Sequence, residues 1–255
     1  MTATVHLEID GGVAVLTMDN PPLNIITAEM RPHFIAALET IVKTPSVRAV
    51  VLTGAGDRSF CAGADLGEEA DLTPDTVRQF LDDDCEIFDG LERLPVPVIA
   101  AINGHCMGGG FEVALSCDLR VAAADAKLCA AGVKVGLVVS TTRLVRLVGP
   151  GVASDVVLTG RTFLGDEAYR LGIATRSVER PRVLEAAKEL AAEIATRAPL
   201  AVRRAKSSIR EAMDLPYEDA MEAELQHFAQ LSSTSDHKEA IEAFFDKRPP
   251  IFSCK

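Results

Sequence analysis

Three consecutive glycines, Gly108 to Gly110, stand between an apolar run and a segment of helical composition. The run PVPVIAAING (95–104) predicts a short buried strand, and FEVALS (111–116) predicts a short helix that begins within the glycines. Glycine lets a ligand approach the main chain closely, and the first amides of a helix have no partner within it. The triplet therefore predicts either a site for a negatively charged oxygen or, more plainly, a tight joint between strand and helix.

The rest of the first three quarters of the chain alternates between strand and helix patterns. Strands are predicted at 4–19 (a hairpin about a Gly-Gly turn), 47–54 and 117–125, and helices at about 27–43 and 74–94. Such alternation indicates an α/β protein.

The character of the chain changes from about Arg182 onward. Ala, Glu, Leu and Lys recur there at helical spacing, which predicts helical segments over 182–214 and 217–233. One more helix is expected to begin at Ser235 as its N-cap and to end before Pro249. The chain is therefore divided into an α/β body, residues 1–195, and a helical region, residues 196–255.

Composition excludes several classes of partner. The net charge of −11 disfavours nucleic acid and anionic membrane surfaces. No apolar run reaches the roughly 18 residues of a membrane span, and the first residues do not form a signal-peptide pattern. The six cysteines make no CxxC pair and no cluster with zinc spacing, so we expect reduced cysteines, no metal and a cytoplasmic location.

Other readings of the glycines and their neighbours are less favoured. GAGDRS (54–59) lacks the third glycine of a dinucleotide-binding loop, and the triplet lacks the Gly-Lys-Ser/Thr ending of a phosphate loop. His105 and Cys106 are neighbours on a predicted strand, so their side chains point to opposite faces and do not form a nucleophile–base pair.

A second glycine turn, at Phe60 to Asp65, also follows a predicted buried strand. SFCAGADL (59–66), followed by the long stretch PVPVIAAINGHCMGGGFEVALSCDLRVAA (95–123), resembles the enoyl-CoA hydratase/isomerase (crotonase) superfamily. The resemblance runs nearly end to end, because it includes DNPPLN (19–24), the stretch 158–178 and the tail 235–252 in the same order.

The resemblance implies a fold and an activity. The fold is a ββα-spiral acyl-CoA-binding core, here 1–195, with a C-terminal helical trimerisation region, 196–255, in a trimer or a dimer of trimers. The substrate is an acyl-CoA or enoyl-CoA thioester, with no cofactor besides the CoA that it carries. The amides of Ala64 and Gly109 form the oxyanion hole for the thioester oxygen, and Glu112 is an acid/base.

The resemblance also implies contacts with CoA and with the acyl group. The main chain near Ala62 contacts the adenine, and Phe244 and Lys247 meet CoA, often across a subunit boundary. Ordinary helix packing is an equal alternative for Phe244. The other positions expected around the substrate are Asp65, Leu66 and Gly108, although a carboxylate that holds a turn is the favoured reading of Asp65 and of Asp118.

The chain departs from the family at one position that matters. The second glutamate of the hydratases falls at Gly132, and no Asp or Glu occurs between Asp125 and Asp155. Three functions therefore stay open: a hydratase in which Glu112 lacks its usual companion, an isomerase or other one-carboxylate enzyme, and an acyl-CoA-binding protein without turnover. We expect hydratase activity first among them.

Overall fold

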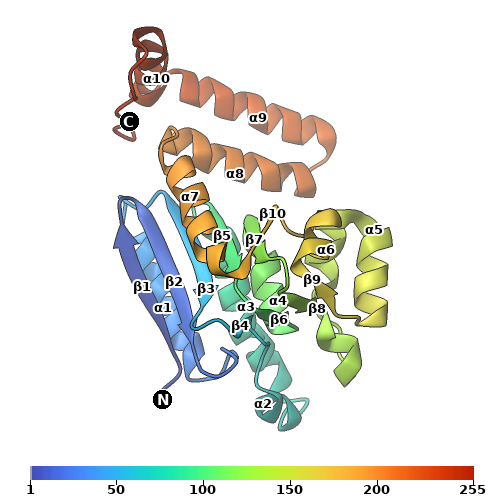
Figure 1. Cartoon of the computed structure of the whole chain (residues 1–255). Helices are drawn as coiled ribbons and strands as arrows, with labels where there is room; N and C mark the ends of the chain where they lie inside the picture. The colour runs from blue at the N-terminus through green and yellow to red at the C-terminus, as the bar shows by residue number, and fades with distance from the viewer. Residues whose placement is uncertain (1) are drawn as a thin grey trace.

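The structure, a computed structural model, describes residues 2–255 (Figure 1). Its larger sheet has six strands in the order β1-β2-β3-β5-β7-β10. β1 and β2 form an antiparallel hairpin, and the other neighbours are parallel. Every residue of β3 and β5 is buried, as expected for parallel strands covered on both faces. The strand bounds are β1 Thr4–Asp10, β2 Val13–Asp19, β3 Ala49–Gly54, β5 Val98–Ile102, β7 Leu119–Ala123 and β10 Arg176–Val178.

A smaller sheet has the order β4-β6-β8-β9, with bounds Ser59–Cys61, His105–Met107, Lys127–Cys129 and Phe163–Leu164. β4, β6 and β8 are parallel neighbours. The carboxyl ends of parallel neighbours meet at one edge of a sheet. This topology therefore brings the turn after β4 next to the glycine triplet after β6.

Helices enclose the two sheets. α7 packs across β3, β5 and β7, and α1 packs against β1 and α3. Phe34, Phe60, Phe111 and Phe163 are among the largest fully buried side chains of the core. The bounds are α1 Met30–Val42, α2 Leu66–Ala70, α3 Val77–Arg93, α4 Gly109–Leu115, η1 Ala131–Val135, α5 Thr141–Thr159, α6 Gly165–Arg170, η2 Arg180–Arg182 and α7 Val183–Ala195.

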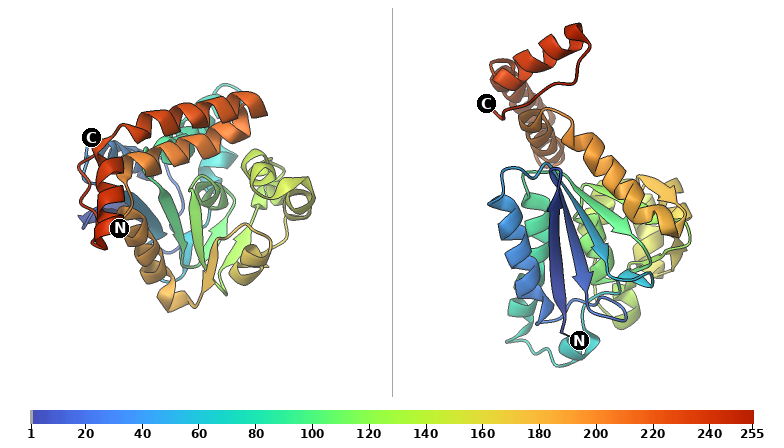
Figure 2. Two further views of the ribbon diagram at one scale, coloured as in Figure 1. Left: turned by 90° about the horizontal axis from the view of Figure 1, so that it is seen from above. Right: turned by 60° about the vertical axis from the view of Figure 1, so that its left-hand side comes forward.

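The last helices, α8 Pro199–Asp214, α9 Tyr217–Ser232 and α10 Ser235–Asp246, form a tail at one end of the body (Figures 1 and 2). α8 is tied to the body by Lys206, whose buried Nζ donates to the Asp118 carboxylate at 2.8 Å and to the Val96 carbonyl at 3.1 Å. The boundary predicted at 195/196 lies in the break between α7 and α8.

The predicted helical stretch 182–214 contains two helices, because the chain breaks after Ala195 and restarts with Pro199 at the first position of α8. One local prediction is wrong. The N-cap of α10 is Thr234 instead of Ser235, and its hydroxyl accepts the amide of His237 at 3.2 Å. Within residues 2–255 no helix is both long and apolar enough to cross a membrane.

Candidate active site

The turn after β4 is held in place by the segment 23–26 near the N-terminus. The amide of Ala62 donates to the Leu23 carbonyl at 3.0 Å. Ile26 then bonds on both sides of Ala64, because its amide donates to the Gly63 carbonyl at 2.9 Å and its carbonyl accepts the Asp65 amide at 3.2 Å. In a parallel bridge of this kind the spanned residue turns its own amide away from the partner strand. The amide of Ala64 therefore faces away from Ile26.

Asn24, at the end of the DNPPLN stretch, fixes the entrance to the same turn. The backbone of Asn24 is left-handed, with φ of 53°. Its buried side-chain amide donates to the carbonyls of Ser59 at 2.8 Å and Ala55 at 3.0 Å. Asparagine is among the few residues other than glycine that adopt this backbone region readily. The DNPPLN motif thus fixes the backbone that leads into the turn after β4.

At each of the three positions of the triplet, the structure favours glycine for a different reason. Gly108 has φ of 50°, a backbone that side chains disfavour. A Cβ at Gly110 would lie 2.0 Å from the Cys61 carbonyl oxygen, so α4 could not approach β4 with a side chain there. A Cβ at Gly109 would lie 3.3 Å from the Ala64 nitrogen. The tight strand-to-helix joint is therefore present at Gly110, and Gly109 lies beside the Ala64 nitrogen.

The two amides that the sequence singles out lie together. Gly109 begins α4 and faces the Ala64 nitrogen across the gap between the two turns. Among residues 2–255, neither the Ala64 nor the Gly109 amide donates a hydrogen bond to a protein acceptor. Two adjacent unpaired N–H donors can bind an oxygen atom on which negative charge develops.

Glu112 lies in the first turn of α4, and its side chain is 7% exposed. One carboxylate oxygen, Oε1, accepts a hydrogen bond from Nη1 of Arg143 at 2.5 Å. The other, Oε2, is buried and has no partner among the described residues. The carboxylate is thus bound through one oxygen and free at the other.

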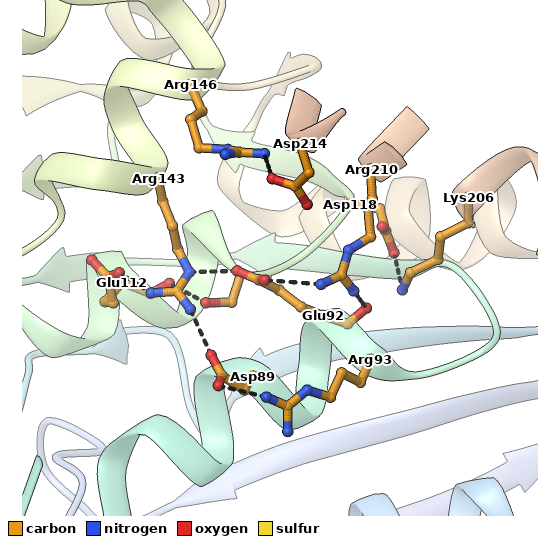
Figure 3. A network of polar contacts seen from close by, with 11 residues as sticks. Asp89, Glu92, Arg93, Glu112, Asp118, Arg143, Arg146, Lys206, Arg210 and Asp214 are labelled. Carbon is orange, nitrogen blue, oxygen red and sulfur yellow. Dashed lines mark hydrogen bonds and ion pairs between the residues drawn. The ribbon is translucent and has the colours of Figure 1, made fainter. Parts of the chain in front are cut away.

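Arg143, near the start of α5, holds three carboxylates at once (Figure 3). Besides Glu112, its Nε donates to Glu92 at 2.5 Å and its Nη2 donates to Asp89 at 3.1 Å, both on α3. Burial opposes the charge of Arg143, but the hydrogen bonds to Glu92 and Glu112 more than offset it and raise its pKa. The sequence carries no signal for Arg143, because no local pattern links it to a glutamate 31 positions earlier.

Gly132 occupies the position predicted for the second glutamate, and the structure shows why it carries no side chain. It is buried in η1, where a Cβ would lie 2.7 Å from Cγ1 of Val139 and 2.8 Å from the Leu137 carbonyl oxygen. η1 adjoins the triplet, since the Cβ position of Gly108 lies 3.9 Å from Cβ of Ala131. The segment is near the site but supplies no carboxylate to it.

The remaining predicted residues divide between the turn and the tail. Asp65 is the N-cap of α2, and its Oδ1 accepts the Gly67 amide at 2.7 Å, while Leu66 begins α2 and is 63% exposed. Asp118 likewise accepts the Val98 amide at 2.7 Å. Phe244 and Lys247 lie at the end of α10, which Figure 1 shows at the far end of the tail from α4. Within one chain they are not brought to the glycine turns.

A cleft of about 660 Å³ lies between α3, α5 and α8 and is separate from the two glycine turns. Arg143 and Glu92 line it, whereas Ala64 and Gly109 do not. Among residues 2–255 no group of three or more His, Cys, Asp or Glu side chains is arranged to hold a metal ion.

The family of this chain follows from its similarity to known proteins. The profile of the enoyl-CoA hydratase/isomerase family matches residues 8–255, and the chain belongs to that family. It is similar to the short-chain-enoyl-CoA hydratase of Clostridium acetobutylicum, at 38% identity over 96% of this chain and 95% of the relative. The crotonyl-CoA hydratase of Syntrophomonas wolfei is 35% identical over 98% of both chains.

A solved structure supports the same conclusion for the fold. The enoyl-CoA hydratase from Bacillus anthracis superposes with a TM-score of 0.95, at 32% identity, over 99% of this chain and 100% of its own. The predicted family and the crotonase-like α/β fold are thus confirmed, and the protein is an enzyme of this family.

Proposed function

We propose that this enzyme adds water across the C2=C3 double bond of a 2-enoyl-CoA thioester. The observation that carries the proposal is the pair of unpaired amides of Ala64 and Gly109, which lie on adjacent turns. They would donate to the thioester oxygen as it becomes an enolate oxygen. Removal of one such donor typically costs roughly 10²–10³ in rate. The similarity to a short-chain-enoyl-CoA hydratase and to a crotonyl-CoA hydratase supports a short acyl chain as the first substrate to test.

Glu112 would carry out both proton transfers. In the first step its free Oε2 takes a proton from water while the water oxygen bonds to C3 and the double-bond electrons move onto the thioester. In the second step the protonated Glu112 returns that proton to C2, and the enolate electrons re-form the thioester carbonyl. One positioned acid or base commonly contributes about 10²–10⁴ in rate.

Binding of the CoA moiety is part of the same proposal. The main chain at Ala62, together with Leu66, would contact the nucleotide and pantetheine portions at the turn after β4. Phe244 and Lys247 would reach CoA from the tail of another subunit, since α10 lies away from α4 in its own chain (Figure 1). Lys247 would supply a local positive charge in a chain of net charge −11.

A second function, isomerisation of a 3-enoyl-CoA to a 2-enoyl-CoA, is favoured by one observation. Gly132 leaves the site with a single carboxylate, and moving a proton from C2 to C4 needs only one base that first accepts the proton and then returns it.

The experiment that tests these functions compares wild type with Glu112→Gln. Crotonyl-CoA should lose its conjugated absorbance with wild type, and the variant should be slower by about 10²–10⁴ while it still binds butyryl-CoA. If a 3-enoyl-CoA gains that absorbance and crotonyl-CoA does not lose it, the enzyme is an isomerase. Binding without either reaction, equally in both proteins, would make it an acyl-CoA-binding protein.

We also propose self-association through the tail, as a trimer or a dimer of trimers. Large apolar side chains of α8, α9 and α10 are exposed in one chain, among them Ile209, Leu225, Phe228, Phe244 and Phe245. Exposed apolar surface of this kind marks an interaction site. Light scattering should give a multiple of the 27.2 kDa chain mass, and Phe228→Glu should lower it.

A cytoplasmic location completes the proposal. All six cysteines are free, as expected in a reducing compartment. Cell fractionation with an antibody against the protein tests it.

A further inference from the structure

We propose that Arg143 is the positioning residue that keeps Glu112 in its carboxylate form and leaves Oε2 as the single proton-accepting atom of the site. The inference rests on the proposed function and deepens it. It accounts for a hydratase site without a second glutamate, because the segment after Gly132 supplies a guanidinium in place of a carboxylate.

The two carboxylate oxygens of Glu112 have different surroundings. Burial of a carboxyl group favours its neutral form, and a cation at hydrogen-bond distance favours the carboxylate. Glu112 is buried, and Nη1 of Arg143 lies 2.5 Å from Oε1. Since Oε1 is already occupied, a proton from the substrate side has only Oε2 to bind, and Oε2 has no other partner among the described residues.

Arg143 is itself held from several sides. Two α3 carboxylates hold its guanidinium, Glu92 at 2.5 Å and Asp89 at 3.1 Å, and its Cζ lies 5.7 Å from the centre of the Phe88 ring. Glu92 is in turn bound by Arg210 of α8, through both its carbonyl oxygen and its carboxylate. Figure 3 shows this chain of contacts running from α4 to α8. A side chain fixed from so many directions can orient Glu112.

The negative and positive charges around Arg143 are equal in number. The network contains the carboxylates of Asp89, Glu92 and Glu112, and the guanidiniums of Arg93, Arg143 and Arg210. Three negative charges thus meet three positive charges. β4 and β6 also pack against α4, and their titratable side chains are His105 and the buried thiols of Cys61 and Cys106. Loss of Arg143 would leave three carboxylates against two cations, and buried Glu112 is the one expected to take up a proton.

The chemical consequence is a definite starting state. The enzyme would enter the cycle with Glu112 ionised and ready to accept the proton of water, not to donate one. Arg143 does not touch the substrate in this scheme and acts through Glu112.

The test uses Arg143→Gln, Arg143→Lys and, as a matched control, Arg146→Gln. Arg146 lies on the same helix and pairs with exposed Asp214 instead of Glu112. With crotonyl-CoA, Arg143→Gln should lower kcat by about 10²-fold and leave KM within roughly threefold. The acidic limb of the pH profile of kcat should move to higher pH in Arg143→Gln. Arg143→Lys should recover part of both effects, and Arg146→Gln should behave as wild type.

A readout independent of turnover uses isotope-edited infrared spectra of ¹³C-labelled glutamate. Arg143→Gln should show a protonated carboxyl band at neutral pH that disappears in Arg143→Gln/Glu112→Gln. If Arg143→Gln keeps the acidic limb and the infrared spectrum of wild type, the proposal is wrong, whatever the loss of kcat. If wild type hydrates no enoyl-CoA, the proposed function fails, and the infrared comparison still decides the role of Arg143.

Discussion

The main-chain nitrogen of Ala64 lies 3.3 Å from the position at which a side chain on Gly109 would begin. The two residues are 45 positions apart, and they meet because β4 and β6 are parallel neighbours whose carboxyl ends share one edge. The proposed oxyanion hole depends on this close approach.

Gly109→Ala is expected to impair the reaction without unfolding the protein. A Cβ at 3.3 Å displaces one of the two amides by a few tenths of an ångström, so kcat/KM for crotonyl-CoA should fall about 10²-fold. Butyryl-CoA affinity, measured by calorimetry, should change little. Gly151→Ala is the control, because its Cβ meets nothing within 4 Å. Full activity in Gly109→Ala would rule out the amide of Gly109 as a donor.

Gly132→Glu should not create a better hydratase. The new Cβ would lie 2.8 Å from the Leu137 carbonyl oxygen and 2.7 Å from Cγ1 of Val139, and such overpacking costs about 1–3 kcal/mol. We expect a melting temperature lower by about 2–10 °C and no gain in crotonyl-CoA hydration. A stable variant with faster hydration would show that the η1 segment adapts and that the missing acid limits the enzyme.

Lys206→Met should destabilise the attachment of α8 to the body. The substitution removes the donor to the Val96 carbonyl and to Asp118, at an expected cost of about 1–3 kcal/mol in the free energy of unfolding. Urea unfolding at fixed protein concentration measures it. Lys43→Met, in an exposed pair with Glu39, should unfold at the same urea concentration as wild type. Equal stability of the two variants would contradict the anchoring role.

The buried thiols should be inert in the folded protein. Burial raises the pKa of Cys61 to about 12 and that of Cys117 to about 12, and it raises that of Cys106 well above its ordinary value. The thiolate is the reactive form, and a raised pKa means that it appears only at higher pH. At pH 8 iodoacetamide should therefore label exposed Cys85 and spare the other three until urea is added. Mass spectrometry locates the label, and rapid labelling of native Cys106 would overturn the prediction.

Local sequence patterns predicted much of the body. Alternation and a Gly-Gly turn identified the hairpin of β1 and β2, and long apolar runs identified β3 and β5, since these strands are buried on both faces. The start of α4 within the glycine triplet was also predicted. The N-cap of α10 was predicted one residue too late, because Thr234 and Ser235 are both residue types that cap helices.

By itself the sequence determined the family, the two glycine turns and the single acidic residue behind them, because these are properties of residue type and order. The tertiary structure alone decided how closely the two turns approach and which side chain binds Glu112. Ala64 meets Gly109 through strand pairing, and Arg143 meets Glu112 through the packing of α5 on α4. Contacts between residues far apart in the chain leave no periodic pattern, so only the folded chain shows them.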